Sequence, residues 1–98
     1  MSEIRFEWDP RKDAANRRKH GVSFLEAETV FSDQAGLLLD DPAHSAHEER
    51  FILLGLSSTL QLLVVVHTYR AGDGVIRLIS ARKATRAERG QYVRRWQG

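Results

Sequence analysis

The pattern of apolar and polar side chains predicts five β-strands. Residues 4–8 alternate, with apolar side chains at the even positions, which is the period of a half-buried strand. The other predicted strands are residues 37–40, 50–56, 60–69 and 75–82. Residues 62–66 are apolar at every position, as expected for a strand in the middle of a sheet.

The first helix is predicted from signals at its two ends. Asp9 is a favourable N-cap, and Pro10 suits the first position of a helix. Gly21 can take the left-handed conformation that ends a helix, so the last helical residue should be His20. Between these ends the side chains are mostly basic, and the only apolar ones belong to two alanines.

Two further helices begin at capping boxes, in which Ser or Thr and a Glu three residues later bond each other's backbone N–H groups. Ser23 and Glu26 form the first such pair, and apolar residues around them recur at helical spacing. Thr85 and Glu88 form the second, which predicts a C-terminal helix. The apolar residues that this helix should bury are Tyr92, Val93 and Trp96.

These elements follow the order β-α-α-β-β-β-β-α. Strands joined by short turns form an antiparallel sheet, and helices must cover its apolar face. We therefore predict an α+β fold with an antiparallel sheet. A chain of 98 residues is long enough for one domain, so residues 1–98 should form a single unit.

The last predicted hairpin gathers polar side chains. If residues 71–74 form its turn, Arg70 pairs with Val75. Because side chains alternate along a strand, Thr68, Arg70 and Arg77 then share one face. The residues expected on the opposite face are His67, Tyr69, Ser80 and Arg82. A β-bulge would change this assignment.

Arg70 and Arg77 are candidate phosphate ligands. A guanidinium is a planar fork of five N–H donors that matches phosphate oxygens and stays protonated. The alternative is that both are ordinary solvent-facing residues of a strand. The same two interpretations apply to the basic residues at the start of the last helix, which are Arg82, Lys83, Arg86 and Arg89.

Other candidates have structural explanations beside the chemical ones. His20 at a helix C-terminus is stabilised by the helix dipole, and Glu88 completes a capping box. His67 lies in an apolar strand, where a buried core histidine is the more frequent finding. The histidines of residues 44–49 lie in a predicted loop without a second ligand cluster, so no metal site is expected.

Composition narrows the class of protein. The chain has no cysteine, so we expect neither disulfides nor thiolate metal sites. Its N-terminal residues lack the pattern of a signal peptide, and no apolar run approaches the ~20 residues of a membrane-spanning helix. The expectation is a soluble cytoplasmic protein that needs no cofactor and does not contact a membrane.

The formal charge differs between the two halves of the chain. Residues 1–50 hold seven basic and eleven acidic side chains, a balance of −4, and residues 51–98 hold eight and two, a balance of +6. This asymmetry indicates an anionic partner for the second half. A solvated, arginine-rich helix face is the alternative.

Several segments together resemble the BrnT family of toxins. The strings Lys-His-Gly-Val-Ser-Phe at 19–24 and Ile-Ser-Ala-Arg-Lys-Ala-Thr at 79–85 are the most specific to it. The other matching positions are 6–10, 16–18, 26–27, 49–51, 63–66, Arg70, 77–78, Glu88 and Tyr92. The likeness runs from about residue 5 to residue 93. The family motif has a glutamate where this chain has Tyr69.

The resemblance implies a RelE-like α+β toxin that cleaves RNA and arrests translation. Its implied partner is a BrnA-type ribbon-helix-helix antitoxin. In that family the toxin–antitoxin complex binds operator DNA, so operator DNA is expected as a partner of the complex only. The implied activity is that of a metal-independent endoribonuclease.

A metal-free ribonuclease makes the 2′-hydroxyl attack the adjacent phosphorus, which requires proton transfer and stabilisation of charge on the phosphorane oxygens. We assign charge stabilisation to Arg70 and Arg77. The candidates for proton transfer are His20, Glu88 and Tyr92. The candidates for supporting phosphate contacts are Lys19, Arg82, Lys83 and Arg86.

The alternative function is a module that binds nucleic acid or an antitoxin and has no catalytic activity. Such a module would use the same basic half and the same sheet. A purely structural subunit would leave the charge asymmetry unexplained.

Overall fold

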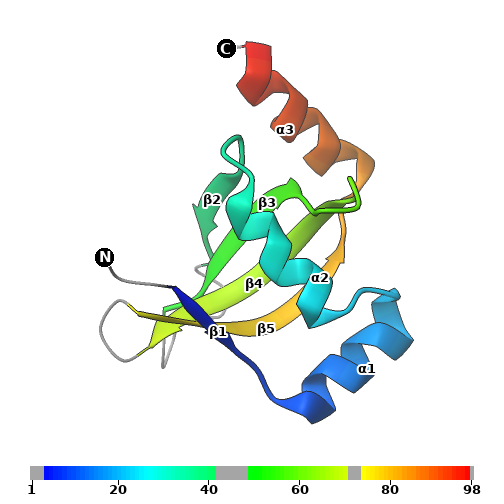
Figure 1. Ribbon diagram of the computed structural model, residues 1–98. Helices are drawn as coiled ribbons and strands as arrows, with labels where there is room; N and C mark the ends of the chain where they lie inside the picture. The colour runs from blue at the N-terminus through cyan, green and yellow to red at the C-terminus, as the bar shows by residue number, and fades with distance from the viewer. Residues whose placement is uncertain (1–3, 42–48, 71–73, 98) are drawn as a thin grey trace.

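The computed structural model describes residues 4–41, 49–70 and 74–97 (Figure 1). The strands are β1 (Arg5–Glu7), β2 (Leu37–Asp40), β3 (Phe51–Leu56), β4 (Leu62–Arg70) and β5 (Val75–Lys83). The helices are α1 (Pro10–His20), α2 (Phe24–Glu28), the 3-10 helix η1 (Thr29–Ser32) and α3 (Arg86–Gln97). The order of strands and α-helices is the predicted one, and η1 is an addition directly after α2.

The strands form one sheet in the order β1-β5-β4-β3-β2. β2 to β5 pair antiparallel, and the apolar strand β4 is central, as predicted. β1 pairs with β5 in parallel, so the prediction of a purely antiparallel sheet is wrong. The helices after β1 lead to β2 at the other edge of the sheet, and about seventy residues separate β1 from β5. No tight turn therefore forces these two neighbouring strands to be antiparallel.

Both predicted caps of α1 are present. The Asp9 carboxylate accepts a hydrogen bond from the backbone N–H of Arg11, and Gly21 has φ 72°, in the left-handed region. In the middle of the helix the buried Asn16 amide bonds the backbone of Ala81 twice, at 2.8 and 3.1 Å. These two hydrogen bonds fasten α1 to β5.

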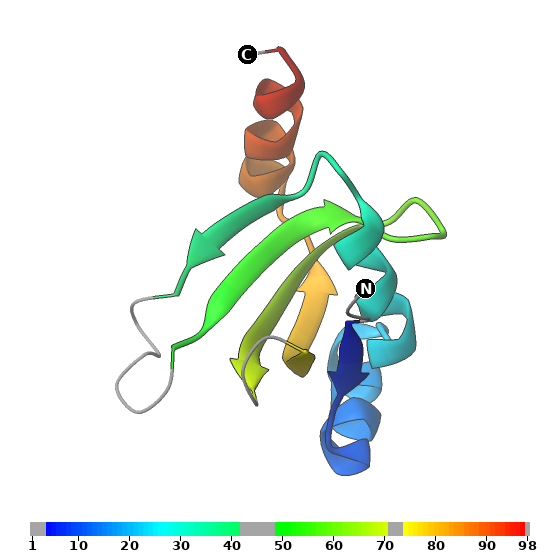
Figure 2. The ribbon, with the colours of Figure 1, turned by 60° about the vertical axis from the view of Figure 1, so that its left-hand side comes forward.

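The two faces of the sheet differ. The first helices, α1 and α2, cover one of them, which we call the helical face (Figures 1 and 2). The main core lies beneath these helices and consists of Val22, Phe24, Ala27, Val30, Leu53, Leu63, Val65, Ile76, Leu78 and Ala81. The other face, which we call the open face, carries a smaller cluster of Leu54, Leu62, Val64 and Tyr92.

The last helix, α3, projects from one end of the sheet (Figure 2). Tyr92 is 5% exposed and packs in the smaller cluster, as predicted. Val93 is 47% exposed, so the prediction that it is buried is wrong. The physical reason is that a projecting helix has only one narrow side against the sheet. The side chain of Trp96 lies outside the described residues.

The hairpin of β4 and β5 keeps the predicted register next to its turn, where Thr68 faces Arg77. Further from the turn the register shifts by one residue, because Ile79 has no partner on β4. An extra residue reverses the alternation of side chains beyond it. Ser80 and Arg82 therefore lie on the open face, and their predicted placement on the opposite face is wrong.

Candidate functional site

Three charged side chains meet on the open face, where β1, β5 and β4 lie side by side: Glu7, Arg70 and Arg77. The parallel ladder sets Glu7 directly beside Arg77. The Arg77 guanidinium donates from Nη1 to Glu7 Oε2 at 2.9 Å, and Arg70 Nε lies 3.6 Å from the same oxygen. We call these three residues the Glu7 cluster.

The Glu7 cluster is accessible from solvent. The exposed fractions of its side chains are 41% for Glu7, 54% for Arg70 and 28% for Arg77. One carboxylate between two guanidiniums leaves the cluster with a formal charge of +1. The two contacts engage one nitrogen of each guanidinium, which carries five N–H donors, and one oxygen of the carboxylate. The cluster can therefore bind an anionic group while a carboxylate oxygen lies beside it.

Thr68 lies next to the cluster but serves another purpose. It is 4% exposed, and its hydroxyl donates to the backbone carbonyl of Glu49 at 2.7 Å. Because a hydroxyl has one proton to donate, Thr68 is a support for the entry to β3 in this structure. Arg70, Arg77 and Thr68 thus share one face as predicted, but the Thr68 hydroxyl proton is engaged by the Glu49 carbonyl.

A second charged group lies at the junction of β5 and α3. Arg82 donates two hydrogen bonds of 2.8 Å to the two carboxylate oxygens of Glu88. Glu88 also accepts from the backbone N–H of Thr85, whose hydroxyl accepts from the backbone N–H of Glu88, so the predicted capping box is complete. The bonds from Arg82, more than any other contact, lower the pKa of Glu88 to about 2. The carboxylate of Glu88 fastens α3 to β5.

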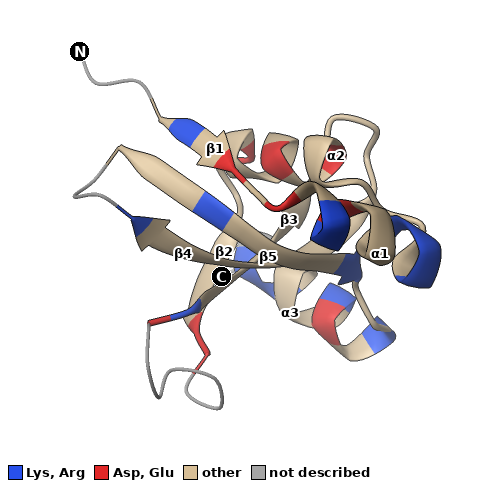
Figure 3. Ribbon diagram, turned by 90° about the horizontal axis from the view of Figure 1, so that it is seen from below, with Lys and Arg blue, Asp and Glu red and all other residues tan. Residues whose placement is uncertain are grey.

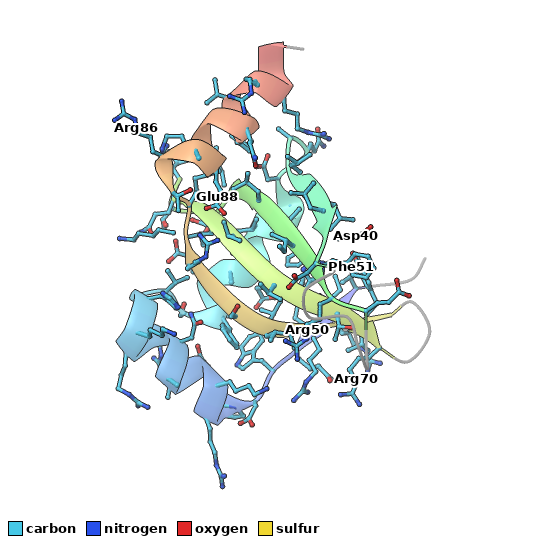
Figure 4. All side chains as sticks on the ribbon, turned by 180° about the vertical axis from the view of Figure 1, so that it is seen from behind. Asp40, Arg50, Phe51, Arg70, Arg86 and Glu88 are labelled. Carbon is cyan, nitrogen blue, oxygen red and sulfur yellow. The ribbon has the colours of Figure 1, made fainter. Side chains whose placement is uncertain are left out.

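The two charged groups lie at opposite ends of β5. Arg77 and Arg82 are five positions apart on this strand, which corresponds to about 16 Å. Figure 4 shows Arg70 at one end of the sheet and Arg86 and Glu88 at the other. Other Lys and Arg residues lie on α1, on α3 and on strands of the sheet (Figure 3). Arg82 and its neighbours therefore cannot bind the same phosphate as Arg70 and Arg77.

The remaining predicted site residues lie elsewhere. Lys19, which is exposed, and His20, which is half-buried, are at the C-terminal end of α1 on the helical face. The hydroxyl of the buried Tyr92 donates to the Asp33 carboxylate at 2.6 Å. Burial opposes the ionisation of Asp33, but two backbone N–H groups and Tyr92 together hold its pKa below its usual value. Tyr92 is thereby tied to the turn after η1.

Glu7 was not among the residues predicted from the sequence. The alternation of residues 4–8 does place Glu7 on the polar side of its strand. The pattern does not say which strand is the neighbour of β1, because that pairing joins residues about seventy positions apart. Only the parallel pairing with β5 brings the carboxylate to Arg77.

The described ranges contain neither a cluster of metal-binding side chains nor a membrane-spanning helix. No three His, Cys, Asp or Glu side chains of residues 4–41, 49–70 and 74–97 are grouped so that they could hold a metal ion. His44 and His47 lie outside these ranges. None of the helices in the same ranges is long and apolar enough to span a membrane.

Comparison with known proteins agrees with the resemblance. The model of the family described as "Ribonuclease toxin, BrnT, of type II toxin-antitoxin system" matches residues 8–88, which include both arginines of the Glu7 cluster. The crystal structure of the Brucella abortus ribonuclease toxin BrnT is similar in fold, with a TM-score of 0.59 and 24% sequence identity. The match covers 88% of this chain and 100% of that one. No curated protein sequence matches the chain. Because the family match extends over most of its length, the chain belongs to the BrnT family of ribonuclease toxins of type II toxin–antitoxin systems.

Proposed function

We propose that the protein is a metal-independent endoribonuclease and that the Glu7 cluster is its active site. The observation that carries the proposal is one accessible carboxylate held between two guanidiniums. This is the pair of functions that cleavage of RNA without a metal requires, namely a group that accepts a proton and groups that stabilise negative charge.

The reaction begins at the 2′-hydroxyl of the substrate. The Glu7 carboxylate takes the proton of this hydroxyl, and the 2′-oxygen forms a bond to the adjacent phosphorus. The bond from phosphorus to the 5′-oxygen then breaks, and the 5′-oxygen takes a proton from solvent water. Glu7 returns its proton to solvent. The products are a 2′,3′-cyclic phosphate and a 5′-hydroxyl.

Arg77 and Arg70 stabilise the phosphorane in this scheme. Negative charge grows on the non-bridging oxygens in the transition state, and preorganised guanidinium donors gain more interaction there than with the ground state. Their contacts with Glu7 hold both side chains on the same small area before the substrate arrives. Positioning of this kind supplies a large part of the acceleration in enzymes with few acid–base groups.

The other basic residues bind flanking phosphates in this proposal. Arg82, Lys83 and Arg86 lie about one strand length from the Glu7 cluster, so they contact phosphates of other nucleotides. Lys19 is on the helical side, and it contributes through the long-range field. His20, Glu88 and Tyr92 are not used for proton transfer, because each lies apart from the Glu7 cluster.

The purified protein is expected to cut single-stranded RNA in the presence of excess EDTA and to leave 2′,3′-cyclic phosphate ends. Electrophoresis of end-labelled RNA, with and without a phosphatase that requires an open 3′-phosphate, checks the product. Loss of cleavage on chelation, restored by a divalent ion, would contradict the mechanism. Tight binding of RNA without any cleavage would favour the alternative of a binding module.

We also propose how the toxin is silenced. The partner is a BrnA-type ribbon-helix-helix antitoxin, and the complex of the two, rather than the toxin alone, binds operator DNA. In the absence of the antitoxin, cleavage of RNA arrests translation in the cytoplasm. The charge balance of +6 in residues 51–98 suggests that acidic or apolar groups of the antitoxin cover the region from Arg70 to Arg89.

Covering this region should exclude RNA from the preformed complex. The antitoxin should also associate more slowly as salt rises and the Debye length shrinks to about 8 Å, because rim charges act mainly on the association rate. Titration of labelled RNA into the complex and stopped-flow measurements at several salt concentrations check both expectations. A ternary complex with RNA and an association rate independent of salt would show that the antitoxin acts elsewhere.

A further inference from the structure

A pocket of about 330 Å³ opens beside the Glu7 cluster, where β3 begins and β4 ends. The residues that line it are Glu49, Phe51, Thr68, Tyr69 and Arg70. Arg70 therefore belongs both to this pocket and to the Glu7 cluster. A molecule that binds the arginine through a phosphate reaches the pocket with its next chemical group.

An aromatic ring forms one wall of this pocket and is open to solvent. Tyr69 is 46% exposed, although it stands in a strand whose preceding residue, Thr68, is only 4% exposed. Because side chains alternate along β4, Tyr69 stands on the helical face and Arg70 on the open face, and the pocket lies at the end of the strand, where both residues line it. The exposed ring offers a flat apolar surface to a ligand.

The Tyr69 ring is held from behind by two other rings. Its centroid is 5.3 Å from that of Phe51 and 5.3 Å from that of His67, and His67 is fully buried. The Tyr69 hydroxyl and His67 Nε2 are 3.4 Å apart, and His67 Nδ1 is 3.2 Å from the Val65 carbonyl. Burial lowers the pKa of His67, so the ring behind Tyr69 is neutral at ordinary pH. Contacts on two sides restrict the Tyr69 ring before any ligand binds.

A restricted ring loses little conformational entropy on binding, which makes it a good stacking surface. Single-stranded RNA presents unpaired bases that stack on aromatic side chains, and each such contact contributes about 1–3 kcal/mol. Arg70 supplies the matching contact with the phosphate of the same strand. The pocket volume of about 330 Å³ is within the range of small-ligand sites.

We propose that Tyr69, supported by Phe51 and His67, stacks on an unpaired RNA base adjacent to the phosphate that Arg70 binds. The proposal rests on the proposed ribonuclease function for the identity of the ligand. It assigns to Tyr69 a role in substrate binding and in the choice of cleavage position, not in the chemical step. The substrate is accordingly a single-stranded segment, because a paired base is not free to enter the pocket.

The test uses binding of RNA that cannot be cleaved. The probe is a short single-stranded oligonucleotide of 2′-O-methyl nucleotides, which lack the attacking hydroxyl, with 2-aminopurine placed at each position in turn. Wild-type protein is expected to quench the fluorescence strongly at one position, and Tyr69→Phe should retain this effect. Tyr69→Leu keeps apolar packing but removes the ring, and should abolish quenching and weaken binding by about 5-fold to 150-fold.

An abasic nucleotide at the quenched position gives a second measurement that needs no variant. It should weaken binding to the wild type about as much as Tyr69→Leu does, and the two changes together should cause no further loss. Equal quenching at all positions, or an abasic site without effect on the wild type, would overturn the proposal. Either result is expected if Tyr69 contacts a protein partner instead of RNA.

Cleavage of unmodified RNA separates this inference from the proposed function. Position-specific quenching without cleavage would leave the stacking site standing and contradict the ribonuclease assignment. Cleavage by a protein that shows no position-specific quenching would support the ribonuclease assignment and contradict the stacking site. Thermal melting of Tyr69→Leu should remain cooperative. If this variant is unfolded, the binding of the abasic oligonucleotide to the wild-type protein tests the stacking site instead.

Discussion

Replacing Arg77 by alanine is expected to slow RNA cleavage by about 10²-fold or more, with Arg70→Ala having an effect of similar size. Both guanidiniums are proposed to contact the phosphorane oxygens, and loss of either leaves part of the developing charge without a donor. The loss should appear in kcat, since the interaction strengthens in the transition state. Single-turnover cleavage of a labelled oligonucleotide measures it.

Two controls separate charge stabilisation from a change in fold. Arg77→Lys keeps the charge but loses the planar fork, so its rate should lie between those of the wild type and Arg77→Ala. Arg94 is an exposed arginine of α3, far along the helix from its junction with β5, and Arg94→Ala is the matched control. Wild-type rates for both Arg70→Ala and Arg77→Ala would show that the site has been assigned wrongly.

Replacing Glu7 by glutamine should lower kcat by about 10²-fold to 10⁴-fold, the usual contribution of a general base. The amide oxygen of glutamine can still accept the hydrogen bond from Arg77, so the arrangement of the two arginines should be preserved. The amide cannot take a proton from the 2′-hydroxyl. Single-turnover cleavage by Glu7→Gln beside the wild type measures the loss.

Glu88→Gln is the matched comparison, because Glu88 is also a carboxylate bonded to an arginine. Its pKa of about 2 is far below the usual value of 4.5, so ionised Glu88 contributes stability that is complete above pH 4.5 and is lost as pH falls towards 2. Glu88→Gln should remove this pH dependence of unfolding. If Glu88→Gln slows cleavage more than Glu7→Gln does, the group that accepts the proton is Glu88, at the junction of β5 and α3, and not Glu7.

Local signals in the sequence predicted most of the secondary structure. The ends of α1 followed from Asp9 and Gly21, and the capping box of α3 followed from Thr85 and Glu88. These signals are reliable because each acts within a few residues of its own backbone. The register near the turn of the last hairpin also depends on few residues, and it placed Arg70 and Arg77 on one face as predicted.

Features that depend on distant residues could not be predicted in this way. The parallel pairing of β1 with β5 joins residues about seventy positions apart, and the extra residue of β5 at Ile79 is visible only in how β5 pairs with β4. For this reason the sequence pointed to the arginines of the Glu7 cluster but not to Glu7 itself. The same applies to Tyr69, whose exposure depends on where β3 begins beside β4.

Glu7 and Arg77 are proposed to belong to one active site. The single-turnover cleavage rate of the double variant Glu7→Gln, Arg77→Ala, compared with the rates of the two single variants, shows whether they do. Groups that act as a unit in catalysis are strongly non-additive. If Glu7 and Arg77 act together, the double variant should be about as slow as the slower single variant, and a rate reduced by the full product of the two single effects would show that they act separately.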